Sequence, residues 1–204
     1  YPQWAKKLGM RYDIEAKHYS EVLVDKLDVL KPKFKVPLNK VVAWHDSCHI
    51  GRAGSGVYEP PRELLKAIPG VQFREMEHNR EKALCCGSVV TLIDEPKVAG
   101  KIGNVRLQEA VAQDADIMAA LCPCCMVQFR IAARDNNVNL EIQDLGALAA
   151  RSLGYDIPDT TNVALTAWAT FDKMIDLMLP ENMTEMMVED RKSTRLNSSH
   201  ESPS

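Results

Sequence analysis

The stretch Lys40-Val-Val-Ala-Trp-His-Asp-Ser-Cys48 passes from an apolar run to polar and reactive side chains. Its first part, Lys40 to Trp44, predicts a buried strand, because a short apolar run rich in β-branched and aromatic residues suits the interior of a sheet. A second run, Ala115 to Leu121, predicts another strand and ends directly at Cys122. Both strands therefore lead into a cysteine.

Helical and strand patterns alternate along the rest of the chain, which favours an α/β fold with a parallel sheet and flanking helices, in a Rossmann-like arrangement. In open sheets of this kind, ligands gather beyond the carboxyl ends of the strands. The expected elements are a helical segment at 13–30, a linker at 31–37, a strand at 40–44, a glycine-rich loop at 51–56, a helix at 60–68, a strand at 71–76, a helix at 96–112, a strand at 115–121, a helix at 124–134, a strand at 140–143 and a helix at 145–153. In the helix at 96–112, one face carries Val98, Ile102, Val105 and Ala112.

The chain divides into four predicted regions. Residues 1–37 form a helical and linker segment that follows a truncated upstream region, since the chain begins at Tyr1 without a methionine. Residues 38–157 form the cysteine-rich domain, and residues 158–190 form a helical segment whose part at 163–179 is amphipathic. Residues 191–204 are polar and without periodicity, and resemble translated vector sequence.

Five of the six cysteines follow a pattern typical of metal clusters: a lone Cys48, the pair Cys85-Cys86 before Gly87, and Cys122 and Cys125 in a C-x-x-C. Thiolates are soft ligands that select iron–sulfur clusters, zinc or Cu(I). A structural zinc ion uses four ligands, usually from two C-x-x-C-like knuckles, and only one such knuckle is present. A polynuclear iron–sulfur cluster would use the surplus of thiols.

Composition excludes several other classes of function. The formal net charge of −3 does not favour nucleic acid as a partner. No apolar run approaches the roughly 20 residues that span a bilayer, so any membrane contact is expected only indirectly, through a partner. Adjacent cysteines in a chain of this size favour a reducing, cytoplasmic setting over a disulfide framework.

The motifs resemble those of the CCG cysteine-rich domain of heterodisulfide reductase catalytic subunits and of related iron–sulfur oxidoreductase subunits, over about residues 40–155. The chain resembles the C-terminal half of such a subunit. The matching stretches are 45–52 (HDSCHIGR), 56–62 (GVYEPPR), 75–79 (EMEHN), 85–87 (CCG) and 122–125 (CPCC).

The resemblance implies a [4Fe–4S] cluster, of the non-cubane type in the reductase branch. Carried over position by position, its ligands would be Cys48, Cys85, Cys86, Cys122 and Cys125. Cys124 occupies the variable position of C-P-x-C and is an additional candidate ligand.

Other residues are candidates for supporting roles. His49 and His45 flank Cys48 and are candidate catalytic groups, which would donate protons to a thiolate product or hydrogen-bond to a cluster sulfur. The first turn of the helix that begins at Cys124 is expected to favour thiolate at Cys124 and Cys125. Backbone N–H groups of the loop Gly51–Gly56 are candidate donors to the cluster. Arg52 and Arg62 are candidates to hold an anionic substrate or to pair with the charge of the cluster, but surface salt bridges are expected at both.

These observations lead to one principal hypothesis and two alternatives. The first is an iron–sulfur oxidoreductase subunit that takes electrons from other subunits of a redox complex and cleaves a small-molecule disulfide. The second is an electron relay in a glycolate- or lactate-type dehydrogenase or a quinone-linked reductase. The third is a zinc-stabilised scaffold without redox activity.

Overall fold

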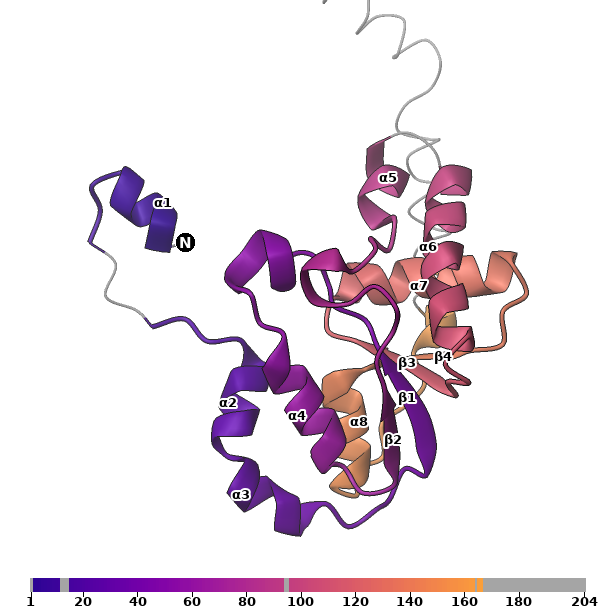
Figure 1. Cartoon of the computed structure of the whole chain (residues 1–204), viewed down its shortest axis with the longest axis horizontal. Coiled ribbons are helices and arrows are strands. Elements are labelled where there is room, and N and C mark those ends of the chain that lie inside the picture. The colour runs from indigo at the N-terminus through magenta and orange to yellow at the C-terminus, as the bar shows by residue number, and fades with distance from the viewer. Residues whose placement is uncertain (1, 12–14, 94–95, 164, 167–204) are drawn as a thin grey trace, which may run out of the picture. The chain divides into compact units, whose positions relative to one another are not determined.

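Four parallel strands form the centre of the fold (Figure 1). The structure is a computed structural model that describes residues 2–11, 15–93, 96–163 and 165–166. The strands are β1 (Lys40–Trp44), β2 (Val71–Arg74), β3 (Ile117–Ala120) and β4 (Glu141–Asp144), in the spatial order β2-β1-β3-β4. The predicted α/β class, with a parallel sheet and flanking helices, is confirmed.

Strands that follow one another in the chain are joined through helices, as parallel pairing requires. The helices are α1 (Pro2–Lys7), α2 (Tyr19–Asp25), α3 (Leu27–Leu30), α4 (Glu59–Ala67), α5 (Ser88–Ile93), α6 (Pro96–Val111), α7 (Pro123–Asp135) and α8 (Leu145–Ser152), with short 3₁₀ turns at Lys31–Lys33 and Arg80–Lys82. No helix in the described ranges is long and apolar enough to cross a membrane.

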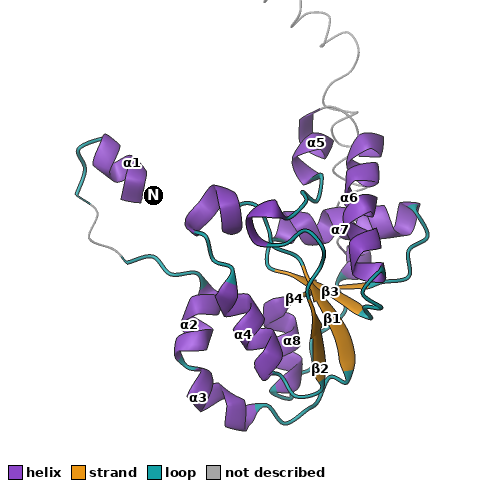
Figure 2. Ribbon diagram, in the orientation of Figure 1, coloured by secondary structure: helices purple, strands orange, loops and turns teal. Residues whose placement is uncertain are grey.

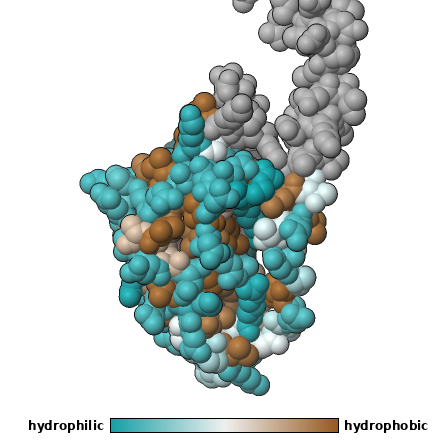
Figure 3. Space-filling model, turned by 90° about the vertical axis from the view of Figure 1, so that its right-hand side faces the viewer, coloured by the Kyte–Doolittle hydropathy of each residue, from teal (hydrophilic) through white to brown (hydrophobic). Residues whose placement is uncertain are grey.

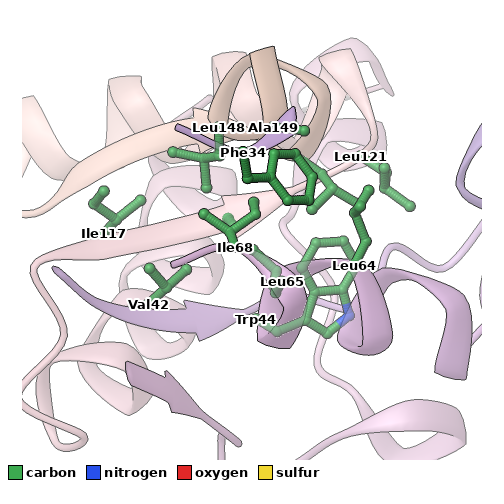
Figure 4. Close-up of a cluster of buried hydrophobic side chains, with 12 residues drawn as sticks. Phe34, Val42, Trp44, Leu64, Leu65, Ile68, Ile117, Leu121, Leu148 and Ala149 are labelled. Carbon is green, nitrogen blue, oxygen red and sulfur yellow. The ribbon is translucent and has the colours of Figure 1, made fainter. Parts of the chain in front are cut away.

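Alternate residues of β1 point into two separate cores, because successive side chains of a strand point to opposite faces of the sheet. Val42 and Trp44 pack with α4 and α8, in a cluster that also contains Phe34, Leu64 and Leu65 (Figure 4). Ala43 packs on the other face, against α6 and α7 (Figure 2). Both cores are needed to bury the strands, and the second core also contains cysteines.

The buried face of α6 differs from the apolar face that its sequence suggests. Val98 and Val105, which were expected on the buried face, are 44% and 56% exposed. Hydrophobic patches are also visible on the largely hydrophilic surface in Figure 3. The buried side of α6 instead consists mainly of small residues and one arginine: Ala99, Gly103, Arg106, Leu107 and Ala110. Small residues there let α6 approach α7 closely.

The first helical segment is shorter than predicted. Residues 15–18 are not helical. His18 has an extended backbone and is the N-cap residue of α2, so the helix begins only at Tyr19. The Nδ1 of His18 accepts a hydrogen bond from the backbone N–H of Ser20, and the Glu21 carboxylate accepts one from the backbone N–H of His18 at 2.7 Å. This reciprocal arrangement satisfies two N–H groups at the start of the helix.

A buried ion pair locks the carboxyl end of β1 to α4. The guanidinium of Arg62 binds both carboxylate oxygens of Asp46, at 2.8 and 2.6 Å, and both oxygens of Glu75, at 3.0 and 2.5 Å. Arg62 is 1% exposed. The expectation of a surface salt bridge at Arg62 is therefore wrong: the ion pair belongs to the interior.

Asp46 accepts two further hydrogen bonds, from the indole N–H of Trp44 at 2.9 Å and from the backbone N–H of Arg80 at 2.7 Å. Burial by itself would raise the pKa of Asp46, but the hydrogen bonds from Arg62, Arg80 and Trp44 outweigh burial and lower it. The carboxylate is therefore charged near neutral pH, and it joins β1, α4 and the 3₁₀ turn before Cys85.

The described residues up to Pro158 form one compact unit, and the described residues from Asp159 onward belong to a second. In the second unit, residues 161–163 and 165–166 are helical. Most of the predicted amphipathic helix at 163–179, and all of the tail at 191–204, lie outside the described residues.

Replacement of Arg62 by methionine should lower the free energy of unfolding by about 3–5 kcal/mol, because it leaves the buried Asp46 carboxylate without its partner. Urea unfolding followed by circular dichroism measures this loss. The matched control is Arg74→Met, which removes an exposed arginine of β2 and should change stability by less than about 0.5 kcal/mol. Equal effects of the two substitutions would contradict the structural role of the ion pair.

Candidate metal centre

The cysteines come from three segments that meet beyond the carboxyl ends of neighbouring strands. Cys48 follows β1, and Cys122 lies two residues beyond the end of β3, where it is the N-cap residue of α7. Cys85 and Cys86 come from the loop between the 3₁₀ turn Arg80–Lys82 and α5. Because β1 and β3 pair in parallel, their following loops lie at the same edge of the sheet.

The side chains of the cysteines interact with one another. The Cys125 thiol hydrogen-bonds with both Cys86 and Cys122, and Cys85 and Cys86 influence the ionisation of Cys48. Cys124 interacts with Cys122 and Cys86 as well. Each of the six cysteines thus interacts with at least one other cysteine, and these pairwise interactions link all three segments.

Burial differs among the six thiols. Cys86 and Cys125 are buried, with 3% and 2% exposure, and both belong to the core between the sheet and α6 and α7. Cys48, Cys85 and Cys122 are partly buried, whereas Cys124 is exposed. The site therefore has a closed inner side and an open outer side.

Cys122 is the thiol most disposed to ionise. A hydrogen bond from the Cys125 thiol, together with the backbone N–H groups of Cys125 and Cys124, lowers its pKa to about 5 against the opposing effect of burial. The hydrogen bond from Cys125 and the backbone N–H of Ser88 likewise lower the pKa of Cys86 to about 7. At neutral pH Cys122 is therefore a thiolate and Cys86 is partly ionised, which suits a site for a soft metal.

The expectation that Cys124 and Cys125 would be the favoured thiolates is wrong. The pKa of Cys125 is raised because its proton is held in hydrogen bonds with Cys122 and Cys86, and then by burial. The pKa of Cys124 is raised by desolvation and by the neighbouring Cys122 charge. The lowered pKa instead belongs to Cys122 at the N-cap of α7, although its side chain makes no capping hydrogen bond.

The glycine-rich loop predicted at 51–56 follows Cys48 and is partly ordered by backbone hydrogen bonds. Residues Gly51–Ser55 have π-helical character, with a kink at Gly54, whose φ of −114° and ψ of −131° are not helical. The backbone N–H groups of Gly51, Ala53 and Gly56 donate to the carbonyls of Ser47, Cys48 and Gly51, respectively. These three groups are therefore already satisfied within the loop.

The two candidate histidines lie in different surroundings. His49 is exposed and adjacent to Cys48. His45 is 1% exposed, and burial together with the charge of Arg106 lowers its pKa to about 3. His45 is therefore neutral near pH 7 and does not act there as an imidazolium acid, although its N–H remains available for hydrogen bonding.

Sequence reasoning missed two residues near the cysteines, Ser88 and Arg106. Ser88 begins α5, donates its backbone N–H to Cys86 and hydrogen-bonds with Cys124. Its position directly after Cys-Cys-Gly is a signal that could have identified it, because the first N–H groups of a helix lack partners within the helix. Arg106 has no comparable signal, since its burial depends on the packing of α6.

The donor set fits a soft metal group. It consists of thiols on separate loops, and two of these thiols have lowered pKa values. Burial and the neighbouring Cys85 and Cys86 raise the pKa of Cys48, whereas the positive charge of Arg52 lowers it. Within the described ranges, no three His, Cys, Asp or Glu side chains are grouped as ligands of a metal ion.

Comparisons with known proteins agree with this site. Residues 42–130 match the model of the CCG family, described as a cysteine-rich domain. The chain is 35% identical over 154 residues to a subunit of the dihydromethanophenazine:CoB–CoM heterodisulfide reductase of Methanosarcina mazei, covering 75% of this chain and 37% of that protein.

Two further relatives have names that state other activities. The chain is 35% identical over 150 residues to the probable iron-sulfur-binding oxidoreductase FadF of Bacillus subtilis, covering 72% of this chain and 21% of that protein. It is 34% identical over 128 residues to a subunit of the fumarate reductase (CoM/CoB) of Methanothermobacter marburgensis, covering 61% and 25%. The chain thus spans between about a fifth and two fifths of the length of these relatives.

Gly87 should tolerate no side chain. Its φ is +88°, and a Cβ there would lie 2.7 Å from the backbone oxygen of Ala99 in α6. Gly87→Ala should therefore lower the free energy of unfolding by about 1–3 kcal/mol. Chemical denaturation measures this effect, and Gly100→Ala is the matched control. Gly100 lies in α6, where an added methyl group would have no atom of the described residues within 4 Å, so alanine there should be neutral or stabilising by about 0.5–1 kcal/mol.

Alkylation should distinguish the thiols in reduced, metal-free protein. Because the pKa of Cys122 is lowered to about 5, its alkylation rate should change little between pH 8 and pH 6 and fall as the pH drops below 5. The rate at Cys124, whose pKa is raised, should still increase above pH 9. Iodoacetamide labelling with tandem mass spectrometry locates each adduct, and parallel pH profiles at the two residues would contradict the assignment.

Proposed function

Since residues 42–130 belong to the CCG cysteine-rich domain family, we propose that this chain is part of an iron–sulfur oxidoreductase subunit of the heterodisulfide reductase type. The observation that carries the proposal is the meeting of six thiols at one edge of the sheet, with lowered pKa values at Cys86 and Cys122. The bound group would be a [4Fe–4S] cluster, which supplies single electrons when bound.

Cys48, Cys85, Cys86, Cys122 and Cys125 would hold this cluster. Cys86 and Cys125 lie on the closed inner side of the site, so they would shield it from water. The two thiols with lowered pKa values need little energy to lose their protons on binding metal. Cys124, exposed and with a raised pKa, would remain outside the ligand set.

The open outer side would admit the substrate, a small-molecule disulfide. Its cleavage consumes two electrons and two protons and yields two thiols. Partner subunits of a redox complex would supply the electrons. His49 is exposed beside Cys48 and is the histidine placed to give a proton to a product thiolate, whereas His45 is buried and neutral.

A second candidate function is supported by relatives whose names state other activities. The chain is also 31% identical over 137 residues to an EtfAB:quinone oxidoreductase of Syntrophomonas wolfei. In this alternative, the same cysteines would hold a cluster that passes electrons between a dehydrogenase and a quinone-linked chain. Any membrane contact would then come through a partner subunit, and the chain itself would work in the cytoplasm.

Metal and sulfide analysis of protein purified without oxygen tests the cluster directly. We expect about four iron and four acid-labile sulfide per chain and a paramagnetic state in electron paramagnetic resonance (EPR) spectra. One zinc ion per chain without sulfide would overturn the proposal in favour of a structural zinc site. A second assay then separates the two functions: a disulfide reductase should catalyse the reduction of an added disulfide by a reduced viologen dye, whereas an electron relay should not.

The ligand assignment predicts different effects for two neighbouring thiols. Cys86→Ser should abolish iron binding or change the EPR spectrum, because Cys86 is buried and its thiolate is favoured. Cys124→Ser is the matched control and should retain nearly all the iron, since Cys124 is exposed. Equal loss of iron in the two variants would show that Cys124 is a ligand.

A further inference from the structure

Arg106 of α6 lies entirely within the protein, with 0% exposure. Its Nη1 donates to the backbone oxygen of His78 at 2.6 Å and also binds the carboxylate of Glu109. Its Nε donates to Nδ1 of His45 at 3.1 Å. A buried guanidinium is costly unless it is paired and hydrogen-bonded, so these contacts hold Arg106 in one orientation.

The contact with Arg106 determines which nitrogen of His45 carries the proton. A guanidinium has only N–H donors and keeps its charge in proteins, so Nδ1 of His45 must accept. The imidazole is neutral, and a neutral imidazole with an accepting Nδ1 carries its proton on Nε2. Arg106 thus fixes the Nε2–H tautomer of His45.

Two N–H groups of this pair have no acceptor among the described residues. His45 Nε2 and Arg106 Nη2 are both buried and without a hydrogen-bond partner. An unsatisfied buried donor costs about 1–3 kcal/mol, and native proteins rarely leave one without an acceptor. Two of them on adjoining side chains indicate that an acceptor occupies this region in the functional protein.

The pair lies in the same layer as the cysteines. The ring of His45 meets Phe129 edge to face, with centroids 4.7 Å apart, and Phe129 follows Cys125 by one turn of α7. Gly103, about one turn before Arg106 in α6, is packed so tightly that a Cβ there would lie 3.1 Å from the backbone oxygen of Cys86. His45 and Arg106 therefore adjoin the residues on the closed side of the site.

We propose that Arg106 and His45 are a pair of buried N–H donors to the sulfur atoms of the group held by the cysteines, with Arg106 as the positioning residue for His45. The inference rests on the proposed iron–sulfur function and adds two residues to it. Hydrogen bonds to the sulfurs and a nearby positive charge stabilise the reduced, more negative state of such a group, so the pair raises its reduction potential.

The first test uses metal-free protein and is independent of the cluster. Long-range ¹⁵N–¹H spectra of histidine-labelled protein should show His45 as the Nε2–H tautomer, assigned by the loss of its signals in His45→Gln. In Arg106→Met the single tautomer should give way to a mixture. Protonation of Nδ1 in the wild-type protein, or an unchanged tautomer in Arg106→Met, would overturn the role of Arg106.

The second test measures the midpoint potential of the loaded protein by EPR-monitored titration. His45→Leu should lower the reduction equilibrium constant about tenfold, which corresponds to 59 mV for a one-electron couple. His45→Gln, which restores an N–H donor, should recover most of the wild-type potential. Arg106→Met should also lower it, whereas Arg130→Met, which removes another buried arginine that binds the Ile142 carbonyl, should not.

The outcomes separate the two proposals. If His45→Leu binds the full amount of iron at an unchanged potential, the acceptor is a trapped water and the donor pair is refuted while the iron–sulfur function stands. If the wild-type chain binds no iron, the proposed function is refuted. The proposal that cluster sulfurs accept hydrogen bonds from His45 and Arg106 is then refuted as well. A shift in His45→Leu that His45→Gln reverses supports the donor pair, because a purely structural defect would not depend on the N–H group.

Discussion

The bidentate contact between Arg62 and Asp46 is the constraint on which the site end of the molecule depends. Asp46 lies at the carboxyl end of β1, two residues before Cys48, and is also bound by the Trp44 indole and the backbone of Arg80. Through Arg62 the same carboxylate fixes α4 and Glu75. One buried charge therefore holds the segments that precede Cys48 and Cys85 in place. Because a carboxylate without its partner is strongly unfavourable in the interior, these segments cannot separate without breaking the pair.

Much of this architecture is predictable from local patterns. The apolar runs that end near Cys48 and Cys122 predicted β1 and β3, and the alternation of strand and helix predicted a parallel sheet. Proline at the first turn located the starts of α4 and α7. Parallel pairing then implied that cysteines far apart in the sequence would share one edge of the sheet. This geometry follows from topology, so it needed no knowledge of individual side-chain contacts.

The features that escaped prediction depend on packing between elements. The apolar residues of α6 suggested a buried face with Val98 and Val105, but the helix buries its small residues and Arg106, since close contact with α7 decides its orientation. Arg62 reads as a surface residue until Asp46 and Glu75 are seen to surround it. The ionisation of the thiols depends on their contacts with one another and on burial, which lower the pKa of Cys122 and raise those of Cys124 and Cys125. Periodicity and motif spacing do not carry this information.

The two cores on opposite faces of the sheet differ in whether they contain candidate metal ligands. The core formed with α4 and α8 is built from aliphatic and aromatic side chains and includes no cysteine among the described residues, whereas the core with α6 and α7 contains Cys86 and Cys125. The first core therefore contains none of the candidate ligands, whereas α7 packs into the second core through Phe129 and Ala132 beside Cys125. A group bound by the cysteines would thus bear on the packing of one face of the sheet and leave the other face unchanged.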